Sequence, residues 1–140
     1  MIDRVEYKGK VMALIMRRGI EPEGVNFFTS ADNSLQLGVI RHKQGFKVKP
    51  HIHKRSTRTI EYTQEVLHIE YGCVEVEFYD DSGTKIGAEI LNTNDTILQI
   101  SGGHGFNMLE DSQIIEVKQG PYRGVEDDKQ IVEVNNDTSL

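Results

Sequence analysis

Two histidines separated by a single residue, His51 and His53, have the side chains and the spacing best suited to chemistry in this 140-residue chain. Pro50 precedes them, and Phe46 and Val48 alternate with lysines, which favours an extended backbone over a helix. Side chains two residues apart on a β-strand project from one face, about 7 Å apart along the strand. We therefore expect both imidazoles to point at one spot, where they can bind a metal ion.

Two more residues are candidates for the remaining ligands. Glu65 shares one face of a strand-like run with Leu67 and Ile69, and a carboxylate among apolar neighbours is costly unless it is paired or metal-bound. Glu65 is therefore expected to be a third ligand. His104, in the glycine-rich segment 101–107, is the candidate for the fourth.

The other acidic and histidine side chains nearby are weaker candidates. Glu61 is a rival carboxylate, because the long interval after His53 could fold to present it. His68 lies three residues from Glu65, an odd offset that places it on the opposite face of a strand. His42 is predicted to be a solvated turn residue. Three nitrogens and one oxygen suit iron(II), manganese, zinc, nickel or cobalt, and the ligand set does not choose among them.

The pattern of glycines and ligands resembles the two motifs of the cupins over about residues 35–119. The first motif consists of Gly45, His51, His53, Glu65 and Gly72, and the second of His104 and Asn107. Two features depart from the family. Eleven residues, 54–64, separate the second histidine from the glutamate, which is longer than the family norm. The proline expected before the second-motif histidine is absent.

The resemblance implies a fold, a cofactor and a range of functions. The fold would be an all-β jelly-roll barrel, the cupin-type double-stranded β-helix, and His51, His53, Glu65 and His104 would hold one divalent transition metal. The chain is similar to small cupins of carbohydrate metabolism, which suggests a metal-dependent enzyme acting on a small polar molecule. An isomerase, an epimerase and a dioxygenase all remain open, and so does a non-catalytic ligand-binding module. Homodimers are common in the family.

A local basic cluster follows the histidine pair. Lys54, Arg55 and Arg58 stand together in a chain of formal net charge −6. They are either a solvated loop or a rim that favours an anionic ligand, such as a phosphorylated or nucleotide-linked sugar. Gln99 and Asn107 are further candidates for substrate contacts.

Composition restricts the class of protein. The acidic balance, with no basic run interleaved with aromatics, disfavours a nucleic-acid partner. The single cysteine, Cys73, cannot form an internal disulfide and is interpreted as a small apolar filler. The apolar run 11–16 is shorter than a signal-peptide core or a membrane span. We therefore expect a soluble, cytoplasmic protein with no membrane partner.

Short alternating runs separated by turns predict the fold class. The expected strands are 5–7, 11–16, 34–42, 65–71, 74–79, 86–91, 96–100, 112–119 and, as an optional last strand, 130–134. Residues 19–32 are expected to form a loop packed by its aromatics. No helical periodicity extends over ten residues, so an all-β sandwich or barrel is predicted. One domain, 1–134, would begin with a hairpin and be followed by a polar tail, 135–140.

Overall fold

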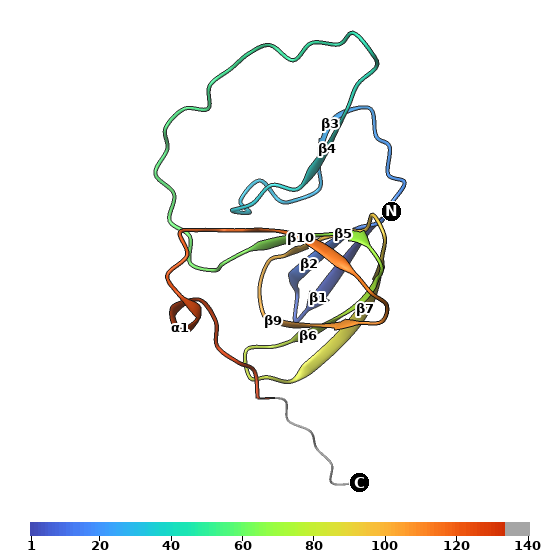
Figure 1. Cartoon of the computed structure of the whole chain (residues 1–140). Coiled ribbons are helices and arrows are strands. Elements are labelled where there is room, and N and C mark those ends of the chain that lie inside the picture. Colours follow the sequence, from blue (N-terminus) through green and yellow to red (C-terminus); the bar gives the residue numbers. More distant parts are fainter. Residues whose placement is uncertain (134–140) are drawn as a thin grey trace.

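The computed structural model describes residues 1–133 and contains ten strands and one short helix (Figure 1). These elements are β1 (Ile2–Tyr7), β2 (Lys10–Met16), β3 (Gly24–Phe27), β4 (Gly38–Arg41), β5 (Glu65–Tyr71), β6 (Cys73–Tyr79), β7 (Lys85–Asn92), β8 (Thr96–Gln99), β9 (Gly103–Met108), β10 (Gln113–Lys118) and α1 (Val125–Asp128). The prediction of an all-β chain is confirmed.

The strands form three antiparallel sheets. A five-stranded sheet has the order β1-β2-β8-β5-β10, a three-stranded sheet has the order β7-β6-β9, and β3 pairs only with β4. The two larger sheets form the body of the molecule and share one buried core, to which β2, β5 and β8 contribute from one side and β6 and β7 from the other. None of the three sheets closes into a barrel within residues 1–133.

Side-chain alternation on β5 explains how the core is built. Leu67 and Ile69 are buried at 3% and 1% exposure, and Leu67 lies directly opposite Ile97 of β8. Residues directly opposite each other in an antiparallel pair share a face, so this row of side chains points between the two sheets. The hydrophobic pattern therefore fixes which face of the five-stranded sheet is inside.

Most predicted strands are present. Strands β1 and β2 form the expected N-terminal hairpin, with a turn at Lys8 and Gly9, whose φ angles are 50° and 76°. The runs 65–71, 74–79, 86–91, 96–100 and 112–119 correspond to β5, β6, β7, β8 and β10. Gly72 makes the tight turn from β5 to β6 with φ 107°, a conformation that glycine adopts at little cost.

Five expectations are corrected. The predicted loop 19–32 contains β3, whose Phe27 is exposed instead of packed, and β4 is shorter than expected and pairs with β3. The glycine-rich segment around His104, which was not among the expected strands, contributes most of strand β9. Residues 130–133 form no strand, and residue 134 and the tail 135–140 lie outside the described residues. Phe46 to His53, expected as a strand, lies outside every strand of the described chain.

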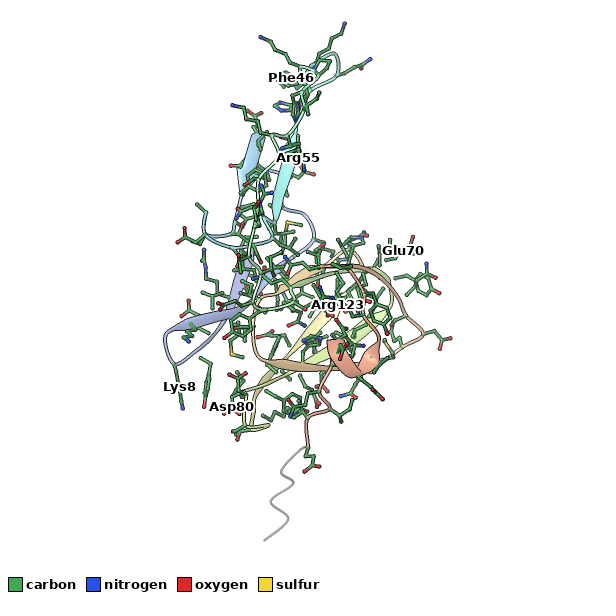
Figure 2. The ribbon with its side chains drawn as sticks, turned by 90° about the vertical axis from the view of Figure 1, so that its left-hand side faces the viewer. Lys8, Phe46, Arg55, Glu70, Asp80 and Arg123 are labelled. Carbon is green, nitrogen blue, oxygen red and sulfur yellow. The ribbon has the colours of Figure 1, made fainter. Side chains whose placement is uncertain are left out.

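One segment projects from the body. Every residue from 40 to 63 is exposed, and we call this segment the arm. The arm begins in the β3–β4 hairpin, and its middle lies well away from the two larger sheets (Figure 1). A view from the side shows Phe46 at the tip and Arg55 along the arm (Figure 2). Residues 54–63 of the long interval are thus a part of this projection.

Candidate functional site

The inner face of the five-stranded sheet changes from apolar to polar at one end. Glu65 of β5 lies directly opposite Gln99 of β8 and Lys118 of β10, in the row next to the apolar pair Leu67 and Ile97. Glu65 is 7% exposed and Gln99 is 4% exposed. The interior therefore ends in a row of buried or half-buried polar groups.

His104 of β9 meets this polar row from the facing sheet. It pairs with Phe78 of β6, whose side chain is buried in the core, so the backbone register directs the imidazole to the same side. The Nε2 atom of His104 lies 3.2 Å from Oε2 of Glu65. This pair connects the two sheets, and we call the polar end of the interior, defined by Glu65, His104 and Glu116, the mouth.

The Glu65 carboxylate is held in its charged form. Its pKa lies below the usual value, first because His104 donates a hydrogen bond to it, while burial acts in the opposite direction. Coulombic interactions with His104 and Lys118 and a hydrogen bond with Glu116 lower the pKa further. Lys118 is itself fixed by Asp128 of α1, whose Oδ2 lies 3.1 Å from its Nζ.

A cavity opens at the mouth. Its volume is about 910 Å³, within the range of small-molecule sites. Its lining includes Glu65, Leu67, His104, Phe106, Ile114 and Glu116. Residues 127–132, at and after the end of α1, form another part of the wall. The cavity thus combines apolar walls with a few convergent polar groups, which is the composition expected of a ligand site.

Gln99 has a polar atom without a partner. Among the described residues, nothing accepts a hydrogen bond from its Nε2, although that atom is fully buried. An unsatisfied buried amide costs about 1–3 kcal/mol, so such a group is unusual in a folded protein unless it serves another purpose. Its place beside Glu65 suits a group that orients this carboxylate or a molecule bound to it.

We predict that Gln99→Leu raises the free energy of unfolding by about 1 kcal/mol. The change replaces an unsatisfied polar side chain with an apolar one of similar size. Thr96→Val on the same strand is the control. Its hydroxyl is satisfied by a hydrogen bond with His68 Nδ1 at 2.9 Å, so this change should lower stability. Urea denaturation measures both. A Gln99→Leu protein less stable than wild type would mean that the amide is satisfied.

The histidine pair lies elsewhere. His51 and His53 are in the arm, where their ring centroids are 5.1 Å apart and the rings meet edge to face, at 71° to each other. The middle of the arm projects away from the two larger sheets, and only its last residues, 61–63, return to line the cavity (Figure 1). Within residues 1–133 no three His, Cys, Asp or Glu side chains are placed to hold a metal ion. One copy of the chain brings together only Glu65 and His104 of the four expected ligands.

The remaining candidates are divided between the arm and the body. Arg55 and Arg58 are exposed on the arm, and neither lines the cavity of the same chain. Asn107 is exposed on β9 and donates a hydrogen bond to Glu75 at 3.0 Å. Glu61 lies at the edge of the cavity. His68 is on the face of β5 opposite Glu65, as its offset predicted.

Two polar residues of the site had no assigned role in the sequence analysis. Glu116 and Lys118 share the inner face of β10 with Ile114, and the alternation within residues 112–119 contains this information. Asp128 had no comparable indication, because a helix of one turn shows no periodicity.

Glu65 and His104 fit a transition metal. Carboxylate oxygens and imidazole nitrogens bind such ions at about 2.0–2.2 Å, so two adjacent ligands of one ion lie about 3 Å apart. The observed 3.2 Å agrees with this spacing. Two ligands are fewer than the three or four that protein sites usually supply.

Comparison of the chain with protein-family models, with curated proteins and with solved structures found no match. In the part of the chain that the structure describes, no helix is both long enough and apolar enough to span a membrane.

Proposed function

We propose that the mouth is a metal-dependent site for a small polar molecule, of the type found in jelly-roll cupins. The proposed ligands are His51, His53, Glu65 and His104. The observation that carries the proposal is the Glu65–His104 pair, which joins two packed sheets at the polar end of an otherwise apolar interior. A buried charged carboxylate beside an imidazole and a cavity is a frequent arrangement of functional sites.

The leading reading is an enzyme. A divalent metal bound here would act as a Lewis acid or an oxygen activator, which leaves an isomerase, an epimerase or a dioxygenase as candidate activities. Glu116 would contact a polar ligand, and Leu67 and Phe106 would exclude water from one side of it. A homodimer in the cytoplasm and a role in carbohydrate metabolism belong to the same proposal.

A ligand-binding module without catalysis is the second candidate. Coordination by four protein groups suits storage or sensing equally well, since a fold does not determine chemistry. A metal that keeps an open, water-filled position beside the cavity favours catalysis, and a closed four-coordinate site favours the module. Spectroscopy of the cobalt-substituted protein distinguishes four-coordinate from five- or six-coordinate ions.

The basic cluster lies on the arm and does not line the cavity of the same chain, so its part in binding an anionic ligand is tested separately. We predict that a sugar phosphate or nucleotide sugar stabilises the protein in a thermal-shift assay, and that Arg55→Ala or Arg58→Ala weakens its binding about tenfold. High salt should reduce the effect. Arg4→Ala, an exposed arginine on β1, is the control. Stabilisation by neutral sugars only, or equal binding by all three variants, would identify the cluster as a solvated loop.

A further inference from the structure

The arm exposes an unusual amount of apolar surface. Its large apolar side chains are Ile40, Phe46, Val48, Ile52, Ile60 and Tyr62, and each of them is exposed. Ile52, between the two histidines, is 92% exposed. Single exposed apolar residues are common, but six along one extended segment are typical of a surface that another molecule covers.

The arm and the rest of the chain carry opposite charges. The arm holds seven of the 16 Lys and Arg residues but only one of the 22 Asp and Glu residues. Its formal charge is therefore +6, and that of the rest of the chain is −12. The body's share of the cavity lining at the mouth includes four acidic groups, Glu65, Glu116, Asp127 and Asp128. The molecule that best complements the arm in charge is therefore another copy of the same chain.

The base of the arm is fixed to the body in a defined direction. Gln64, the first residue after the arm, is buried, and its side chain exchanges two hydrogen bonds with that of Asn33 at 2.9 and 3.0 Å. Its backbone N–H donates to Gln119 Oε1 at 2.8 Å, beyond the end of β10. These contacts fix the end of the arm to the segment before β4 and to the residue after β10.

We propose that the arm docks at the mouth of a second copy, so that His51 and His53 of one chain complete a metal site with Glu65 and His104 of the other. This inference rests on the proposed function. Each mouth has two of the four ligands, and each arm presents the other two as a pair. In a two-fold dimer each arm docks at the mouth of the other copy, which gives two identical sites and leaves no arm unpaired.

The arrangement also explains why the arm carries both apolar and basic side chains. Ile52 enters a cavity with apolar walls, while the lysines and arginines on either side meet the acidic rim. An anionic polymer would neutralise the lysines and arginines but would leave the apolar side chains in water. The twelve residues from His53 to Glu65 can span up to about 40 Å, so chain length alone does not exclude a return within one copy. The experiment below separates the two arrangements.

Two variants with different affinity tags test the inference. The arm variant carries His51→Ala and His53→Ala, and the mouth variant carries Glu65→Gln and His104→Ala. Each alone should retain little zinc or iron by elemental analysis, whereas wild type should carry about one ion per chain. The two variants are co-expressed and purified through both tags in turn. The mixed dimer has one complete site, so about half the wild-type metal per chain should return.

The outcomes separate the inference from the proposed function. If wild type binds metal, both variants lose it and the mixed dimer recovers none, the ligands come from one chain, and the inference is wrong while the proposed function stands. If wild type binds no metal, or both variants keep it, both are wrong. A metal-loaded wild type that stays monomeric by light scattering also overturns the inference. If the mouth variant does not fold, His104→Gln alone replaces it.

Discussion

Replacement of His104 by alanine is expected to weaken binding of zinc or iron(II) by at least about a hundredfold. Loss of a group that only orients a ligand already costs about 10–100-fold in metal affinity, and loss of a ligand itself costs more. The imidazole lies 3.2 Å from the Glu65 carboxylate and no other His side chain lines the cavity in the described structure. Competition with a metal-binding dye measures the affinity, and elemental analysis measures the content.

His68→Ala is the matched control, because this histidine lies on the same strand as Glu65 but on the opposite face of β5. It should leave metal affinity unchanged. His51→Ala should lower it, and Glu65→Gln should lower it more than Glu61→Gln. A His68 variant that loses the metal while the His51 variant keeps it would contradict the assigned faces. Equal losses at both glutamates would mean that Glu61 also binds.

The strands of the body were predictable from the sequence, for a physical reason. The alternation in 65–71 and 74–79 sorts side chains to two faces of a strand, and it exists because one face is buried in the shared core. The same alternation assigned Glu65 to the interior and His68 to the other face. Both placements depend only on residue parity along a strand.

Strand β9 was missed because its sequence lacks that alternation. Three of the positions in and just before it are glycines, which favour turns, and it forms a strand because β6 offers it a paired edge. The arm was misassigned for the opposite reason. Phe46, Val48 and Pro50 indicate an extended backbone, but a strand also needs a partner, and sequence pattern does not supply one. A partner from a second copy is not visible in one sequence at all.

The closed end of the body, opposite the mouth, contains the strongest ion-pair network of the described chain. Arg17 follows β2, beyond the Met16–Thr96 pair, whereas the mouth lies at the Gln99 end of β8. Its guanidinium lies 2.8 Å from Asp3, 3.1 Å from Glu89 and 3.3 Å from Asp95. It also donates a hydrogen bond to the Ile90 carbonyl at 2.6 Å. These contacts connect β1 and β2 to β7, so they fasten the two larger sheets together.

We predict that Arg17→Met lowers the free energy of unfolding by about 2–4 kcal/mol, because Asp95 is then a buried charge that has lost its cation. Asp95 is only 3% exposed and already accepts backbone hydrogen bonds from Arg18 and Asn92 at 2.9 Å each, so it cannot move into solvent without breaking them. Urea denaturation at neutral pH measures the change.

Lys85→Met tests whether burial is the cause. Lys85 makes an equally short contact of 2.8 Å with Glu77, but its side chain is 45% exposed, so its loss should cost much less stability than the loss of Arg17. Metal affinity should be unchanged in both variants, since both residues lie outside the mouth. Equal losses of stability would show that the Arg17 network acts as an ordinary surface ion pair. A loss of metal in the Arg17 variant would show instead that the spacing of the two sheets at the closed end controls the distance between Glu65 and His104.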